Sequence, residues 1–374
     1  MTFRCSAILV CLLCIPSMTS FGAEAPPLFE KTRPDWEIKF ADVDNAVMSV
    51  AAGESKKTFH DPLTNKDVKW EQDVACPSFT VFNGKLYCVY RAYGDDDEWR
   101  LGLAQSRDGL HFTRSDQPVL YAKPSDAFLG PLLKVKNQSV TYGDPRLTVG
   151  EDGGFYLYFN FVHYGKTTND QQLAVATSRD LSDWTVHGRI FAKQSPNDRA
   201  LIPEKSPWRL PVATVVSRFE GDRFVATKIR GKYWAYFTCY ATKGPYCLGV
   251  ATSENLLDWK LFRDKNGKLP DPLPARRGYF DSWYTDPVAA VLRDDGILLI
   301  YNGVNAEAKS GGDARRMYYS HYPAQALFSK NDPTQLLKRS ESPFKGGDAE
   351  LEKKPLAFWC APLYEALSLV PFKG

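Results

Sequence analysis

The segment Ala176-Thr-Ser-Arg-Asp-Leu-Ser-Asp-Trp184 decides the fold, because the chain repeats it. Close copies begin at Ala104 and Ala251, and a degenerate copy lies at Tyr318-Tyr-Ser-His321. The shared serines are 72, 75 and 67 residues apart. A repeat of this length is too long for common solenoids, and it suits one four-stranded blade of a β-propeller with generous loops.

A second repeated feature is a hairpin around a glycine turn, which precedes the first phrase. Runs of Val, Tyr, Phe and Trp flank each turn, a strong hairpin signal. The hairpins span residues 79–90, 147–159, 224–237 and 288–301, and a fifth copy begins at Tyr364. We therefore predict an all-β, five-bladed β-propeller whose last blade is incomplete or closed by N-terminal strands. Two packed β-sandwiches are the alternative, which the repeated hairpin disfavours.

The first residues differ from the rest of the chain. Arg4 is followed by an apolar run from Cys5 to Ile15, and Ser20-Phe21-Gly22 offers a small-x-small cleavage site. The run is too short to span a bilayer, so residues 1–22 are predicted to be a signal peptide and residues 23–374 one domain. An uncleaved anchor helix is the alternative. We expect a secreted or periplasmic protein without membrane insertion after cleavage.

Charge narrows the range of partners. The chain has 47 basic and 44 acidic residues, and the basic ones are dispersed rather than clustered. Nucleic acid and anionic membranes are therefore not expected as partners.

The cysteines suggest neither a metal site nor a cofactor. Cys239 and Cys247 flank a turn and would face each other across a hairpin, where a disulfide and a pair of buried thiols are both reasonable. No spacing resembles a zinc site.

Acidic residues recur where the chemistry of a propeller is expected. The first strand of each blade lines the central channel, so residues just before each hairpin converge on one axial pocket. Like charges gathered there would raise some pKa values, and a glycosidase uses such a pair as acid and base. The alternative is a purely structural role, because an aspartate before a proline often begins a turn or a strand. Counting back from each turn glycine gives Asp73, Asp144, Asp222, Asp286 and Glu365.

Aromatic residues are frequent, at 13% of the chain. Trp99, Trp208 and Trp283 fall in predicted loops near the mouth of the channel, where they could stack on sugar rings. Most other tryptophans are expected in the core.

Several motifs, taken in order, resemble glycoside hydrolase family 130, the five-bladed mannoside phosphorylases and hydrolases. The resemblance covers roughly residues 59–374 and rests on the following segments: Gly84-Lys-Leu-Tyr-Cys-Val-Tyr-Arg-Ala92, Leu101 to Arg114, Gly143-Asp-Pro-Arg146, Phe280-Asp-Ser282 with Asp286-Pro287, and Asp332-Pro-Thr-Gln-Leu-Leu-Lys-Arg339.

The resemblance implies roles for particular residues. Asp144 matches the aspartate implicated in protonating the glycosidic oxygen. Arg91 and Arg146 would hold sugar hydroxyls or orient carboxylates, and Asp286 or Glu365 would be the base that activates water. Inversion is expected, because the family transfers the sugar in one displacement. The remaining expected substrate contacts are Asp73, Asp222, Lys228, Asp281 and Trp283.

The sequence also departs from the family pattern. Gly143 replaces a glutamate, Cys76 replaces an asparagine, and Asp286 stands where related sequences carry a glutamate. Phe237-Thr238 stands where phosphorylases have His-Arg, and phosphorolysis needs a cationic cradle for phosphate. We therefore favour an exported, inverting hydrolase of β-mannoside-type oligosaccharides. A phosphorylase, a glycosidase for other glycans and a non-catalytic sugar-binding propeller are the alternatives.

Overall fold

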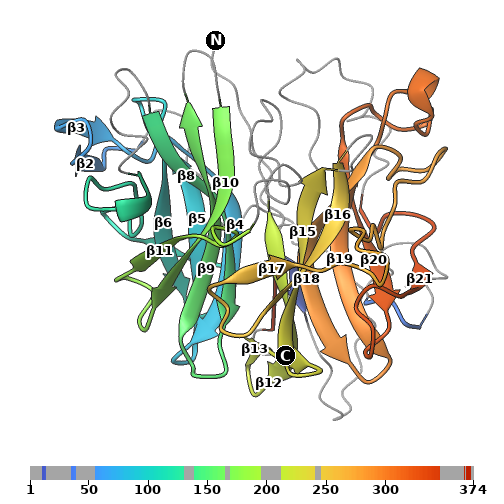
Figure 1. Cartoon of the computed structure of the whole chain (residues 1–374). Helices are drawn as coiled ribbons and strands as arrows, with labels where there is room; N and C mark the ends of the chain where they lie inside the picture. The colour runs from blue at the N-terminus through green and yellow to red at the C-terminus, as the bar shows by residue number, and fades with distance from the viewer. Residues whose placement is uncertain are drawn as a thin grey trace, which may run out of the picture.

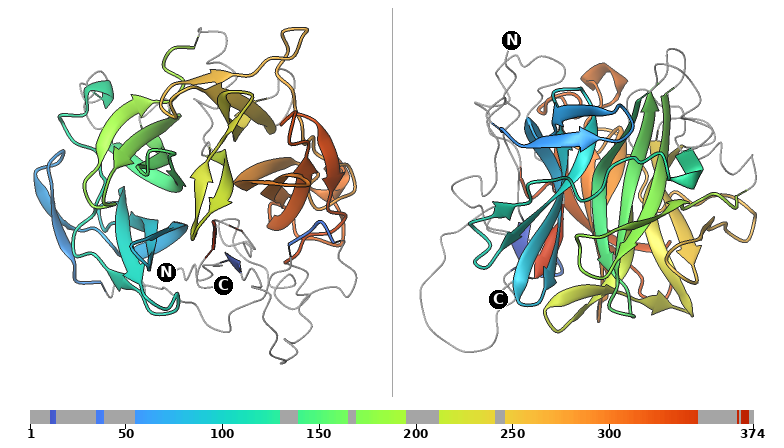
Figure 2. Two further views of the ribbon diagram at one scale, coloured as in Figure 1. Left: turned by 90° about the horizontal axis from the view of Figure 1, so that it is seen from below. Right: turned by 90° about the vertical axis from the view of Figure 1, so that its left-hand side faces the viewer.

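The computed structural model describes residues 11–13, 35–38, 55–129, 139–164, 169–194, 212–240, 246–345, 366 and 368–371. Figure 1 shows the strands running steeply between the two ends of the molecule, and Figure 2 shows the blades arranged around a central axis. The secondary structure of the described residues is almost entirely β, as predicted.

Four blades of four main strands follow one another along the chain. Blade one is β4 (Asp73–Phe82), β5 (Lys85–Tyr93), β6 (Trp99–Ser106) and β7 (Thr113–Arg114); blade two is β8 (Ser139–Val149), β9 (Phe155–Tyr164), β10 (Asn169–Ser178) and β11 (Thr185–Arg189). Blade three is β12 (Ala213–Glu220), β15 (Lys232–Tyr240), β16 (Tyr246–Ser253) and β17 (Trp259–Leu261), with β13 (Arg223–Ala226) and β14 (Lys228–Ile229) inserted; blade four is β18 (Tyr284–Arg293), β19 (Gly296–Val304), β20 (His321–Phe328) and β21 (Leu336–Arg339).

The remaining elements are short. A hairpin outside blade one consists of β2 (Thr58–Asp61) and β3 (Lys66–Lys69), and the 3-10 turns are η1 (Ala127–Leu129) and η2 (Ala308–Ser310). No helix in this part of the chain has the length and apolarity required to cross a bilayer.

Apolar side chains fill the spaces between blades, which explains the continuous apolar runs in the sequence. All nine residues of β19 are buried, because a middle strand has neighbouring blades on both faces. One cluster joins Tyr236 and Val250 of blade three to Leu299 and Tyr322 of blade four.

The first strands of adjacent blades approach each other around the axis. β12 pairs in parallel with β18, with Val216 opposite Ala290, and β13 pairs in parallel with β8. Equivalent positions of β8, β12 and β18 therefore lie near one another although they are far apart in sequence.

The fifth position of the ring contains strand β22 (Leu369–Pro371). The Ser368 hydroxyl accepts a hydrogen bond from the Phe79 amide of blade one, and Ala366 exchanges two hydrogen bonds with the Asn302 side chain of blade four. β22 also pairs in parallel with β1 (Cys11–Leu13), inside the predicted signal peptide. The described residues thus place one strand in the predicted fifth blade.

The repeated serine phrase ends the third strand in blades one to three. In blade four the predicted copy at Tyr318-Tyr-Ser-His321 instead leads into the third strand, β20, and Ser329 is the serine that follows that strand. The Ser178 hydroxyl accepts hydrogen bonds from the amides of Asp180 and Leu181, and Ser106 and Ser253 do the same in their blades. The residue three positions after the serine has a positive φ in each copy: 81° at Gly109, 71° at Leu181 and 64° at Leu256. The phrase is therefore a turn signal that closes the strand, and glycine suits its tightest position.

The cysteine hairpin has the predicted register. Cys239 lies directly opposite Cys247, and the two Sγ atoms are 2.8 Å apart. The hairpin register thus brings the two side chains face to face, as the sequence predicted.

Candidate active site

The first strands carry their key residues at bulges before a proline. Register shifts occur at Cys76-Pro77 in β4, at Asp144-Pro145 in β8 and beside Pro287 in β18. Proline cannot donate to the strand ladder, so the chain bulges there and turns the preceding side chain. Cys76 and Asp144 both adopt a left-handed conformation, with φ of 51° and 42°. Such strained backbone is typical of functional positions.

Asp144 is held by one charged and one neutral donor. Arg91 Nη1 of blade one donates to Oδ1 over 2.8 Å, and Asn160 Nδ2 of blade two donates to Oδ2 over 2.8 Å. The carboxylate side chain keeps 11% of its surface exposed. Asp144 is therefore oriented from two sides and still accessible from the third.

Gly143 explains how Trp99 reaches this site. A Cβ atom at position 143 would lie 2.8 Å from Trp99 Cε3, 2.9 Å from Asn160 Oδ1 and 3.3 Å from Arg91 Cδ. The Trp99 ring also lies over the Arg91 guanidinium, 4.5 Å from ring centre to Cζ. The missing side chain thus leaves space for an indole that packs on Arg91, the donor to Asp144.

Asp286 has a different environment. It is 7% exposed and accepts a 2.9 Å hydrogen bond from the hydroxyl of Thr238, a buried residue of blade three. Thr238 lies on the second strand of blade three, at the position where the sequence comparison with phosphorylases predicted that an arginine is replaced. A neutral hydroxyl therefore orients Asp286.

Sequence reasoning missed a regular feature of the second strands. Each has a polar residue directly after an aromatic one: Arg91, Asn160, Thr238 and Asn302. In blades one, two and four this residue lies near the bulge of the first strand. Three of these side chains reach a neighbouring blade or the fifth position, at Asp144, Asp286 and Ala366. The signal was available as a polar residue interrupting an apolar strand at one place in each repeat.

Asp73 lies close to this site but not at the equivalent position. It begins β4, three residues before the bulge at Cys76. Burial raises its pKa above the usual range, while a hydrogen bond from the Val74 amide and the nearby charge of Arg91 oppose that rise. Asp73 therefore shares Arg91 electrostatically with Asp144, whereas Cys76 is the residue that matches Asp144.

Asp222 and Lys228 lie elsewhere, which corrects their prediction as substrate contacts. Asp222 is exposed in the turn between β12 and β13, beyond Arg218, which pairs with Leu292 at the far end of β18 from Asp286. Lys228 is exposed on β14 and lies over the Tyr233 ring. Blade three contains the extra β13–β14 segment, so counting back from its turn glycine reached the wrong end of the blade.

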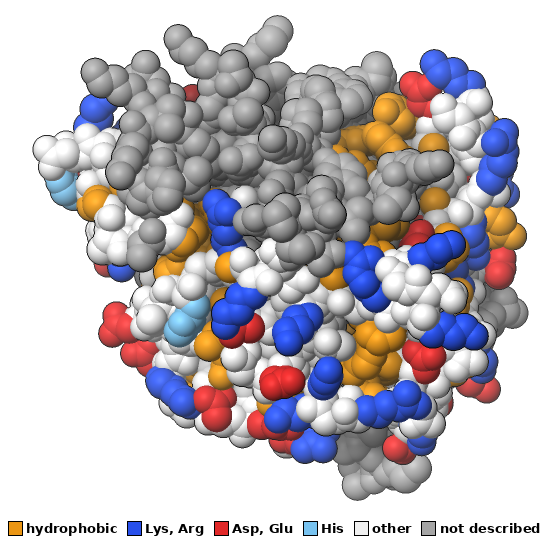
Figure 3. Space-filling view, in the orientation of Figure 1, with side chains coloured by type: hydrophobic (Ala, Val, Ile, Leu, Met, Phe, Trp, Pro, Cys, Tyr) orange, Lys and Arg blue, Asp and Glu red, His pale blue; other side chains and the backbone are white. Residues whose placement is uncertain are grey.

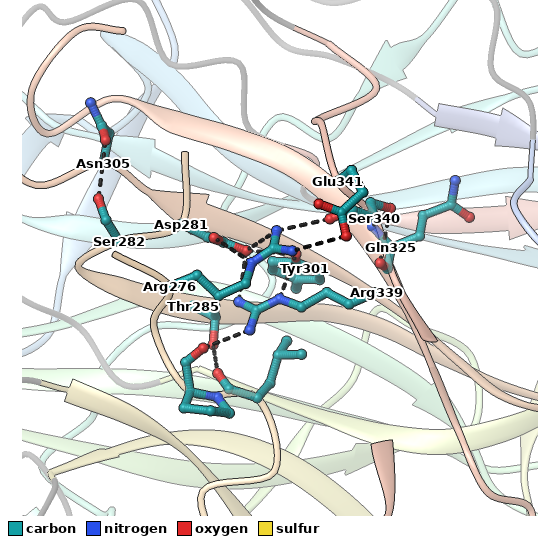
Figure 4. A network of polar contacts seen from close by, with 12 residues as sticks. Arg276, Asp281, Ser282, Thr285, Tyr301, Asn305, Gln325, Arg339, Ser340 and Glu341 are labelled. Carbon is teal, nitrogen blue, oxygen red and sulfur yellow. Dashed lines mark hydrogen bonds and ion pairs between the residues drawn. The ribbon is translucent and has the colours of Figure 1, made fainter. Parts of the chain in front are cut away.

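Asp281 is also corrected, because its carboxylate is fully buried. Arg276 donates to both of its oxygens, Arg339 Nη2 donates over 2.6 Å, and the Tyr301 hydroxyl donates over 2.9 Å. Figure 4 shows Arg276 and Arg339 converging on this group. Asp281 therefore binds protein donors, and it connects the segment that precedes β18 with Arg339 of β21.

Of the remaining residues predicted to contact substrate, the structure describes some and not others. Arg146 is buried, lines a small cavity between the first strands of the blades, and donates from Nη1 to the Pro145 carbonyl oxygen. Trp283 is half-buried three residues before Asp286, and Tyr318 stacks on its ring with centroids 5.7 Å apart. Glu365 and Trp208 lie outside the described residues.

The surface seen in Figure 3 mixes charges of both signs. Lys and Arg side chains are interspersed with Asp and Glu over its lower part, without a single basic stripe. This agrees with the dispersed charges of the sequence.

Comparison with known proteins identifies the family. Residues 57–343 match the model of glycoside hydrolase family 130, described as beta-1,4-mannooligosaccharide phosphorylase. A 1,2-beta-oligomannan phosphorylase of Thermoanaerobacter is 30% identical over 76% of this chain and 79% of its own. Two solved structures are each 31% identical to the chain. A glycosyl hydrolase from Bacteroides ovatus has a TM-score of 0.70 and covers 84% of both chains. The second has a TM-score of 0.69 and covers 83% of this chain and 82% of its own. It comes from work on glycoside hydrolases within this family of mannoside phosphorylases, which target beta-1,2 mannosidic linkages in Candida mannan. The chain therefore belongs to glycoside hydrolase family 130 and has its β-propeller fold.

Proposed function

We propose that this protein is an inverting hydrolase of β-mannosides, with Asp144 as general acid and Asp286 as the base that activates water. The observation that carries the proposal is the holding of Asp144 by Arg91 and Asn160, next to the axis and still partly exposed. A fixed carboxyl group at an accessible position suits protonation of a leaving oxygen.

Thr238 supports hydrolysis over phosphorolysis. Attack by phosphate requires cations that neutralise its charge, and the side chain that faces Asp286 from blade three is a neutral hydroxyl. A hydroxyl can orient a carboxylate base without adding a positive charge of its own beside it.

Phosphorolysis is the second candidate, favoured by the relatives named as phosphorylases and by the family description. One assay separates the two reactions: the purified protein is incubated with β-1,2- and β-1,4-linked mannooligosaccharides, with and without phosphate. We expect free mannose at a rate independent of phosphate, released as the α-anomer in proton NMR. Phosphate-dependent mannose 1-phosphate would overturn the hydrolase proposal. Binding without turnover, unchanged in Asp144→Asn, would instead favour a sugar-binding propeller.

The role of Asp286 has a separate test. Asp286→Ala should lose hydrolysis, and azide should restore turnover by attacking in place of the activated water. The product expected from a β-mannoside is the α-mannosyl azide, because one displacement inverts the anomeric carbon. Lack of rescue, with the variant folded, would remove Asp286 from this role.

We also propose that the protein is exported after cleavage behind Gly22. The proposal rests on the apolar run and the cleavage site in the first 22 residues. The mature chain would then lack β1, the parallel partner of β22. Intact-mass measurement of the protein recovered outside the cytoplasm tests this, and a chain that retains Met1 would contradict it.

A further inference from the structure

A small cavity lies on the axis of the ring, just past the Asp144 and Asp286 positions. Residues from β8, β12 and β18 line it together with β4 and β22, and its volume is about 50 Å³. One water requires about 10–15 Å³ of such volume, so the cavity has room for a few water-sized bodies. Its polar lining consists of Ser78, Arg146, Thr148, Thr214, Ser217 and Ser368.

Arg146 is the charged residue of this lining. Arg146 is only 8% exposed, and its Nη1 donates a hydrogen bond to the carbonyl oxygen of the adjacent Pro145. Its Nε is buried without a hydrogen-bond partner. None of the carboxylates in the described part of the chain forms an ion pair with it. A buried charge without a counter-charge is costly, and Arg146 has no acidic partner among the described residues, so an anion beside it would be stabilising.

The surrounding hydroxyls can complete an anion site. Ser78 Oγ accepts the amide hydrogen of Leu147, and Ser368 Oγ accepts that of Phe79. Because each oxygen already accepts a backbone donor, its hydroxyl hydrogen can point into the cavity as a donor. Val288 and Leu369 line other parts of the wall and lower the local polarity.

We propose that this cavity binds a monovalent inorganic anion of the halide class, held by Arg146 and the serine hydroxyls. One guanidinium balances one negative charge, whereas a phosphate dianion would leave a second charge buried in a partly apolar site. The anion would lie two residues beyond Asp144 along β8, between the first strands of the blades.

Bromide provides a direct probe. Crystals of the wild-type protein grown in gluconate and soaked in sodium bromide should show an anomalous peak within about 3.5 Å of the Arg146 guanidinium, the reach of a charge-assisted contact. In solution, chloride or bromide at constant ionic strength, with gluconate as the balancing anion, should raise the melting temperature by about 2–4 °C near saturation.

A pair of arginine variants separates this site from general salt effects. Arg146→Met should abolish the halide-dependent shift, whereas Arg218→Met, which changes an exposed arginine paired with Glu220 on β12, should keep it. Retention of the shift in Arg146→Met would overturn the proposal. So would wild-type crystals with only water in the cavity. Stabilisation by phosphate at lower concentration than by halide would refute the monovalent assignment, even if Arg146→Met does not fold.

Discussion

Asp144 and Asp281 are both aspartates bound by arginine, yet the structure gives them opposite environments. Asp281 is surrounded by Arg276, Arg339 and Tyr301, and nothing of it is exposed. Asp144 has one arginine and one asparagine, and part of its side chain remains open. The difference teaches that an ion pair alone does not mark a catalytic group. What distinguishes Asp144 is a surface left accessible to a ligand.

The sharpest test of this comparison is Asp144→Asn. We expect turnover of a β-mannoside to fall about 10²–10⁴-fold, the usual contribution of a general acid. The variant should remain folded, because asparagine has the same shape and Arg91 retains solvent contact. Steady-state kinetics with circular dichroism measures both quantities. A substrate with a highly acidic leaving group should be affected less, because it needs little protonation.

Asp281→Asn should have the reverse profile. The substitution removes the negative charge that faces the buried Arg339 and leaves Arg276 with only Glu341, 3.8 Å away. We therefore expect a loss of about 3–5 kcal/mol in the free energy of unfolding. Urea denaturation measures this loss, and kcat per folded molecule should stay near the wild-type value. A variant as stable as wild type but inactive would assign Asp281 to the substrate site.

Gly143→Ala tests how Asp144 is positioned. The added Cβ would meet Trp99 and Asn160 closer than ordinary contact, so one of the groups around Asp144 must move. We expect kcat/KM to fall about tenfold and stability to drop by about 1–3 kcal/mol. Gly154→Ala is the matched control, because its Cβ would contact the side chains of Asp152 and Arg179, which are exposed. Equal effects of both substitutions would contradict the special role of Gly143.

The smallest effect is expected for Asp222→Asn. This carboxylate is exposed in the β12–β13 turn, so stability should change by less than about 0.5 kcal/mol and activity should be unchanged. Kinetics and urea denaturation of the same preparation provide the measurements. A marked loss of activity would restore Asp222 as a substrate contact.

The sequence predicted the blades better than it predicted their inner surface. The serine phrase and the glycine hairpins reflect local turn chemistry, so blades could be located without tertiary information. The serine phrase located three of them, and the glycine hairpins located all four. Asp144 and Asp286 were found by counting back from each turn glycine and from the family motifs, and the proline after each of them, first taken as a possible turn signal, proved to mark a bulge. In blade three the inserted β13–β14 segment displaced the count, which led to Asp222 instead of the start of β12.

Contacts between distant segments could not be predicted in the same way. The burial of Asp281 depends on Arg339, which is 58 residues away in sequence. The arrangement of groups around Asp144 depends on Trp99 of another blade, which packs on Arg91 and fits only because position 143 is glycine. Periodicity describes one strand at a time, whereas these environments arise where two blades meet.

The polar residue that follows an aromatic one in each second strand has a wider consequence. Since every repeat delivers the same backbone position towards the centre, exchanging Arg91, Asn160, Thr238 or Asn302 alters the local chemistry while the rest of its blade keeps its packing. A single substitution at one of these positions can therefore change which groups face the site. New reactivity on this scaffold can thus arise from substitutions at these four positions while the propeller fold stays the same.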